Sequence, residues 1–82
     1  MPVTLRLGMA AANLMVEEFP LAEKYMKKED ESHWVFSAEV CRYEGVARFV
    51  LGLYEDVEIM DSPDFEEFMK EKVKKISEKI KV

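Results

Sequence analysis

The stretch that decides the fold is WVFSAEVCRYEGVARFVLGLYEDVEIMDSP, residues 34–63. Its apolar residues first recur at every second position, then at a helical spacing, and then at every second position again. This order predicts a strand, a helix and a second strand. Ser62 and Pro63 follow, and this pair is a favourable start for a further helix. The segment therefore indicates a small α+β fold.

The first half of the chain adds a strand, a helix and an edge strand. Apolar alternation at Val3, Leu5 and Leu7 predicts the first strand, and Pro20 ends the helix that follows it. Lysines among residues 21–29 are typical of an edge strand that resists unwanted pairing. We expect strands over residues 3–7, 21–29, 33–41 and 57–60, a charged hairpin loop over 29–32, and helices over 9–19, 43–53 and from 63 onward.

The element order is βαββαβ with one more helix at the C-terminal end. Its known solution is the ferredoxin-like fold, an antiparallel sheet in the order 4-1-3-2 with the first two helices on one face. Alternation along residues 33–41 puts four side chains on the core side: Trp34, Phe36, Ala38 and Val40. The last helix must cover part of the other face, pack at the edge of the sheet, or pack on another domain or subunit.

Composition describes one domain, residues 1–82, with 49% hydrophobic and 35% charged residues. The net charge is −5, and no basic stripe precedes the last helix, so we expect no nucleic-acid binding by this chain alone. No apolar run is long enough for a membrane span. A single cysteine, Cys41, fits a reducing cytoplasm. A strand that begins at Val3 is typical of a domain that is part of a longer protein.

The residues that could carry chemistry are scattered. His33 and Cys41 share a strand face but lie ~26 Å apart along the strand. Metal binding needs three or four clustered ligands, and adjacent acids such as Glu17 and Glu18 do not face each other on a helix. We therefore expect no catalytic residue, no metal and no cofactor, and a protein that is not an enzyme.

Three other classes share this topology. RNA-recognition sheets expose aromatics on their central strands, whereas Trp34 and Phe36 alternate onto the core side here. Acylphosphatases need a glycine-rich loop and an arginine after the first strand, where this chain has Leu7, Gly8, Met9 and Ala10. Small-molecule-binding modules of the ACT type carry few sequence marks, so an ACT-like regulatory domain stays open as the alternative function.

The chain resembles the C-terminal extension, or WCX domain, of bacterial WYL-domain transcriptional regulators. The resemblance rests on Phe36 to Val40 in a strand, Arg48 to Gly52 in a helix, and Val57 to Pro63 leading into the last helix. It covers nearly the whole chain. Many relatives have an arginine soon after that proline, whereas residues 64–67 here are Asp, Phe, Glu and Glu. The anion contact of that arginine is therefore not carried over.

The resemblance implies a fragment from the C-terminal end of a cytoplasmic regulator whose WYL and helix-turn-helix domains lie outside this chain. It implies a non-catalytic regulatory and oligomerisation module that contacts other domains or a second subunit, modulates the effector response, and meets DNA only through the parent protein. The expected interaction surface is the apolar stripe of the last helix: Phe65, Phe68, Met69, Val73, Ile76 and Ile80. A second candidate surface is the open sheet face, with Thr4, Arg6, Ser37 and Glu39.

Overall fold

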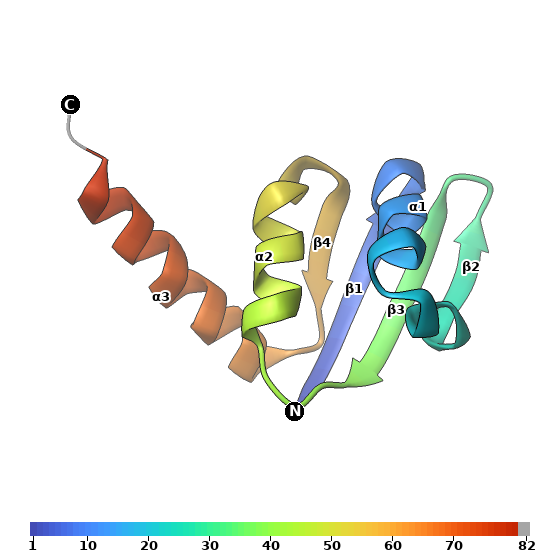
Figure 1. The fold of residues 1–82 in the computed structure, drawn as a ribbon, viewed down its shortest axis with the longest axis horizontal. Coiled ribbons are helices and arrows are strands. Elements are labelled where there is room, and N and C mark those ends of the chain that lie inside the picture. Colours follow the sequence, from blue (N-terminus) through green and yellow to red (C-terminus); the bar gives the residue numbers. More distant parts are fainter. Residues whose placement is uncertain (81–82) are drawn as a thin grey trace.

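A four-stranded antiparallel sheet in the order β2-β3-β1-β4 forms the centre of the molecule (Figure 1). The computed structural model describes residues 1–80. Along the chain the elements are β1 (Pro2–Gly8), α1 (Met9–Glu18), the 3₁₀ helix η1 (Pro20–Tyr25), β2 (Met26–Asp30), β3 (His33–Glu39), α2 (Glu44–Gly52), the 3₁₀ turn η2 (Tyr54–Asp56), β4 (Val57–Met60) and α3 (Pro63–Lys79). The predicted α+β fold, with βαββαβ order, this sheet and a C-terminal helix, is confirmed.

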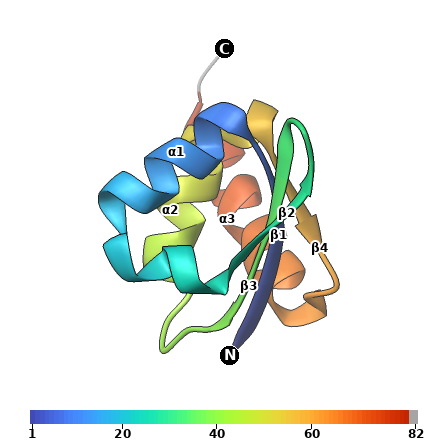
Figure 2. The ribbon, with the colours of Figure 1, turned by 90° about the vertical axis from the view of Figure 1, so that its right-hand side faces the viewer.

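The register of the sheet places the apolar side chains on one face. In the central strand β1, Leu5 lies opposite Phe36 of β3 and Ile59 of β4. Helices α1 and α2 both lie on that side, and the opposite face of the sheet is uncovered (Figure 2). Val3, Leu5 and Leu7 are fully buried. Phe36 is buried, while Trp34, Ala38 and Val40 pack partly buried against the core, as the alternation predicts.

The connection after α1 differs from the predicted strand over residues 21–29. Pro20 to Tyr25 form η1, and the edge strand β2 begins only at Met26. The reason is local. A proline at the first position has the φ angle of a helical turn, and Ala22 turns into the core while Leu21 points outward. The hairpin is also tighter than predicted, because β2 continues to Asp30 and only Glu31 and Ser32 form the turn.

The central strand β3 ends at Glu39, two residues earlier than predicted. Cys41 consequently lies outside the strand and is exposed. Helix α2 follows within one residue of its predicted bounds and buries Ala47, Phe49 and Val50. The core lies between these residues, α1 and the apolar face of the sheet.

Helix α3 packs at the β4 edge of the sheet beside α2, and then leaves the body of the molecule (Figure 1). Its first half is anchored by Phe65, which is fully buried, and by Met69. The ring of Tyr43 lies 5.1 Å from that of Phe65 and 5.2 Å from that of Phe68. The projecting second half gives the molecule its long dimension of 40 Å.

Two side chains make contacts that the sequence did not predict. Ser62 precedes α3, as expected, but its hydroxyl does not cap the helix. It is buried, accepts a hydrogen bond from the Thr4 backbone N–H at 2.8 Å, and donates one to the Met60 carbonyl at 2.6 Å. Asp56 accepts a hydrogen bond from the backbone N–H of Ala11 at 2.8 Å, and so caps α1 from a distant part of the chain.

None of the helices within residues 1–80 combines the length and the apolar character that crossing a bilayer requires.

Candidate functional site

The apolar stripe of α3 divides into an anchored part and an exposed part. Phe65 and Met69 belong to the core, and Phe68 is partly buried against it. Beyond them, Val73, Ile76 and Ile80 are 50%, 43% and 64% exposed. The sequence predicts all six as one interaction surface, but only the three exposed side chains are free to meet a partner. We call these three residues the α3 stripe.

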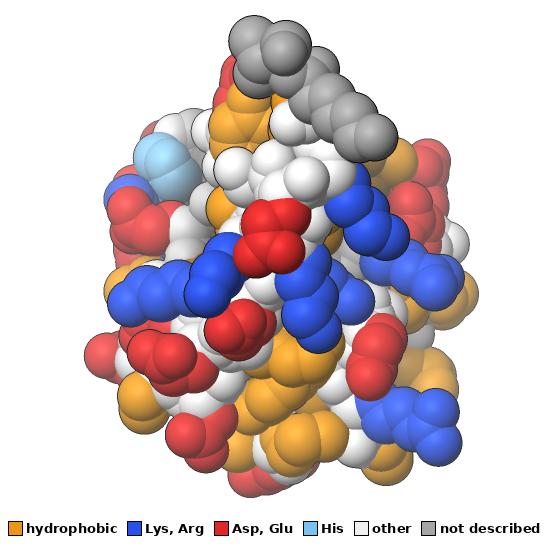
Figure 3. Space-filling view, turned by 90° about the vertical axis from the view of Figure 1, so that its left-hand side faces the viewer, with side chains coloured by type: hydrophobic (Ala, Val, Ile, Leu, Met, Phe, Trp, Pro, Cys, Tyr) orange, Lys and Arg blue, Asp and Glu red, His pale blue; other side chains and the backbone are white. Residues whose placement is uncertain are grey.

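The α3 stripe continues into a groove between α3 and the body of the domain. The groove has a volume of about 540 Å³ and is mainly apolar. Its walls come from α2 and η2 (Val50, Leu51, Tyr54), from β4 (Val57, Glu58, Ile59) and from α3 (Glu66, Met69, Lys70, Val73). On the side of the molecule that α3 occupies, hydrophobic side chains form a patch between basic and acidic ones (Figure 3).

Charge is distributed unevenly between the second half of α3 and the rest of the chain. Residues 1–69 contain 15 acidic and six basic residues, a net charge of −9. Residues 70–79, the second half of α3, contain five lysines and two glutamates, a net charge of +3. The half-helix that carries the α3 stripe is therefore basic, whereas the groove beside it has Glu58 and Glu66 along its walls.

The open sheet face is polar and internally paired. The hydroxyls of Thr4 and Ser37 lie 3.2 Å apart, across the β1–β3 pair. The amino group of Met1 contacts the Glu39 carboxylate at 2.8 Å. The four predicted residues of this face therefore lie on one surface. They form no cavity among themselves and present little apolar area to a partner.

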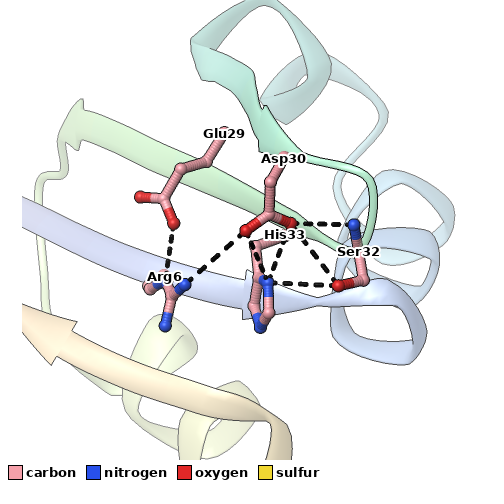
Figure 4. A network of polar contacts seen from close by, with 5 residues as sticks. All are labelled: Arg6, Glu29, Asp30, Ser32 and His33. Atoms are coloured by element: carbon pink, nitrogen blue, oxygen red, sulfur yellow. Dashed lines mark hydrogen bonds and ion pairs between the residues drawn. The ribbon is translucent and has the colours of Figure 1, made fainter.

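Arg6 links this face to the β2–β3 hairpin (Figure 4). Its Nε donates a hydrogen bond to Glu29 at 2.7 Å, and its terminal NH2 group lies 3.8 Å from Asp30. The Glu29 hydrogen bond raises the pKa of Arg6. A bulge between Lys28 and Asp30 interrupts the alternation of β2, so two adjacent acids reach the same arginine. Sequence alternation alone would have placed them on opposite faces.

His33 belongs to the same network rather than to bulk solvent. Its Nδ1 lies 2.9 Å from Asp30, and the backbone N–H of Ser32 donates to the same carboxylate at 2.8 Å. These two contacts, that of Ser32 first, lower the pKa of Asp30. Spacing three residues apart across the hairpin turn could have suggested the His33–Asp30 pair. Cys41 lies beyond the other end of β3 and takes no part in it.

Within residues 1–80, no group of three or more potential metal ligands comes together. The candidate surfaces are therefore an apolar one along α3, which suits contact with a partner, and a sheet face whose charged groups pair with one another.

Comparison with known proteins gives one match. A family model described as the WCX domain matches residues 1–77. No curated protein and no solved structure matches the chain.

Proposed function

The chain belongs to the WCX domain family, the C-terminal extension of WYL-type transcription regulators, and we propose that it serves in such a regulator as the module through which two subunits associate. In this proposal α3 is the contact element and the partner is a second copy of the chain. The association adjusts how the regulator responds to its effector.

The observation that carries the proposal is the exposure of the α3 stripe. Val73 and Ile76 are about half exposed on α3, and Ile80, which is 64% exposed, follows directly after the end of the helix. The spacing of three residues places Val73 and Ile76 on one helix face. Scattered exposed hydrophobic residues are normal on a protein surface, but a contiguous set beside an apolar groove is typical of a contact site.

Charge favours a second copy as the occupant of the groove. The basic half of α3 matches the acidic body of another copy, and the groove of that copy carries Glu58 and Glu66. A parallel or antiparallel pairing of the two C-terminal halves alone would instead bring lysines against lysines, which is destabilising. We therefore infer a reciprocal arrangement, in which each α3 lays its C-terminal half across the groove of the other subunit. A twofold axis makes these two contacts identical.

The expected affinity is modest. Full burial of an aliphatic side chain is worth about 1.5–3 kcal/mol, and each stripe residue has only part of that to gain. Association itself costs about 4–15 kcal/mol. The isolated chain should therefore dimerise weakly, and contacts elsewhere in the parent regulator would raise the effective concentration of the two copies.

Sedimentation equilibrium over a wide concentration range tests the proposal. We expect concentration-dependent dimerisation of the unaltered chain, and its loss on Ile76→Asp or Val73→Asp. Leu21→Asp is the matched control, since Leu21 is 75% exposed but lies on η1, away from α3. A chain that stays monomeric at millimolar concentration, or a dimer that survives both α3 variants, contradicts the proposal.

The regulatory part is tested in the intact regulator. We expect Ile76→Asp to alter the effector dependence of DNA binding, while Met9→Asp leaves it unchanged, because Met9 is 54% exposed on α1, away from α3. Equal effector responses of the two variants and the unaltered regulator would rule out a regulatory role for the α3 contact.

A further inference from the structure

A second apolar pocket lies on the helix side of the sheet, far along the sheet from the β4 edge. It has a volume of about 290 Å³ and is enclosed by α1, η1, the end of β3 and the first turn of α2. Apolar side chains form most of its lining, including Met15, Phe19, Tyr25, Phe36, Ala38 and Val46. Ligand sites are typically concave, mainly apolar and equipped with a few polar groups. This volume, at the lower end of such sites, suits a small molecule.

Two charged side chains line the same pocket, and they differ in their contacts. Glu39 is held by the amino group of Met1 at 2.8 Å, and that amino group also donates to the Val40 carbonyl at 3.0 Å. Arg42, in contrast, is exposed, and no ion pair joins it to another residue within 1–80. The pocket therefore combines an apolar interior with a cation that has no partner in the described part of the chain.

We propose that this pocket binds a small apolar carboxylate, with a ring or a branched chain inside and the carboxylate on Arg42. A guanidinium can donate two parallel hydrogen bonds to a carboxylate, which fixes the orientation of the ligand. The aromatic rings of Phe19 and Tyr25 and the buried Phe36 supply apolar contact for the body of the ligand.

This site is independent of the proposed α3 contact, because the pocket and the groove have no lining residue in common. It gives the small-molecule-binding alternative a definite place in the molecule. A regulator domain with such a pocket could respond to a metabolite of this class without any change at α3.

The test is a titration of the chain followed by backbone amide NMR shifts, with 3-phenylpropionate and 4-methylpentanoate as probes. For each acid we expect saturable shifts clustered at the pocket, with a Kd in the millimolar range or below, as befits ligands of this size. The uncharged 3-phenylpropionamide should bind more weakly. Absence of saturable shifts at the pocket overturns the proposal, as does equal binding of acid and amide.

Substitutions in the pocket test whether the ligand carboxylate contacts Arg42. Arg42→Gln should weaken binding of 3-phenylpropionate by at least about tenfold, the effect of losing a hydrogen bond to a charged group. Arg48→Gln is the matched control, because Arg48 is exposed on α2 and does not line the pocket. Ala38→Leu should block the interior. Since Arg42 is exposed, its variant should fold normally, and unchanged binding by Arg42→Gln would refute the proposal even if Ala38→Leu proved unstable.

Discussion

The cap of α1 by Asp56 makes the sharpest prediction about stability. Gly8 occupies the position before α1 where a capping side chain usually stands, and it has none to offer. Asp56, 45 residues further along the chain than Ala11, supplies the acceptor instead. A Cβ atom added to Gly8 would overlap this carboxyl group and lie 2.5 Å from its Cγ. The absence of a side chain at Gly8 therefore leaves the space in which the Asp56 carboxylate caps α1.

The loss of stability on removing the Asp56 cap follows from the hydrogen bond and the charge that the cap supplies. Asp56→Ala removes a capping hydrogen bond and a negative charge at the N-terminus of α1, which should lower the free energy of unfolding by about 1–2 kcal/mol. Gly8→Ala should also lower the free energy of unfolding by about 1–2 kcal/mol, because the new methyl group displaces the Asp56 carboxylate from the Ala11 N–H. The backbone itself causes no strain there, since φ −76° and ψ −178° suit any residue. In the double variant the obstruction is gone, so its loss should match that of Asp56→Ala alone.

The four proteins form a double-mutant cycle that urea denaturation can measure. We expect a coupling energy of about 1–2 kcal/mol between the two sites. Melting temperatures should follow at about 4–8 °C per kcal/mol. Gly45→Ala is the control, because a Cβ at Gly45 in α2 meets nothing within 4 Å, and it should cost no stability. If the double variant loses the sum of the stabilities that the two single variants lose, Gly8 and Asp56 are not coupled and the prediction is refuted.

Three other substitutions or titrations test separate parts of the structure. Ser62→Ala should lower the free energy of unfolding by about 1–3 kcal/mol in urea denaturation, because it leaves the part-buried backbone N–H of Thr4 without an acceptor. Phe65→Ala should cost about 3–5 kcal/mol by the same measurement, because it opens a cavity where α3 is anchored. NMR titration should place the pKa of Asp30 below the usual range for aspartate, because the Ser32 backbone N–H and His33 both favour the ionised carboxylate. The contribution of Asp30 to stability is therefore present above the usual aspartate range and is lost as the pH falls through the lowered pKa. His33→Ala should move this pKa part of the way back.

Alternation and helical spacing predicted the elements and the buried face of the sheet, and the crossover rule then gave the sheet order. A strand buried on one face repeats its apolar residues at every second position, and a slip of one residue would expose the whole set. Leu5 and Phe36 face each other in the structure because both belong to such a set. The fold was thus accessible from local patterns combined with a topology rule.

Contacts between distant segments were not accessible in this way. Residues 20–25 have a weak apolar pattern, so the geometry of Pro20 and the burial of Ala22 decided their conformation. The sequence predicts Ser62 as a local helix cap, but its hydroxyl instead accepts a hydrogen bond from the backbone N–H of Thr4 in β1. Likewise, the bulge that brings Glu29 and Asp30 to Arg6 depends on how β2 pairs with β3. In each case the pairing of strands determines which polar groups meet.

The last helix combines both situations. Spacing predicts an apolar stripe along it, and the structure shows that the domain buries Phe65 and Met69 and leaves Val73 and Ile76 exposed. The exposed part of α3 includes the β-branched residues Val73 and Ile76, which favour helix less than Ala, Leu or Lys do. A helical extension of this length without packing is only marginally stable in water. Contact with a second copy would bury the stripe and order the extension, so amides of this half should exchange with solvent faster than those near Phe65 in the monomer and become protected on association. Rapid exchange that persists in an established dimer would show that the subunits meet elsewhere.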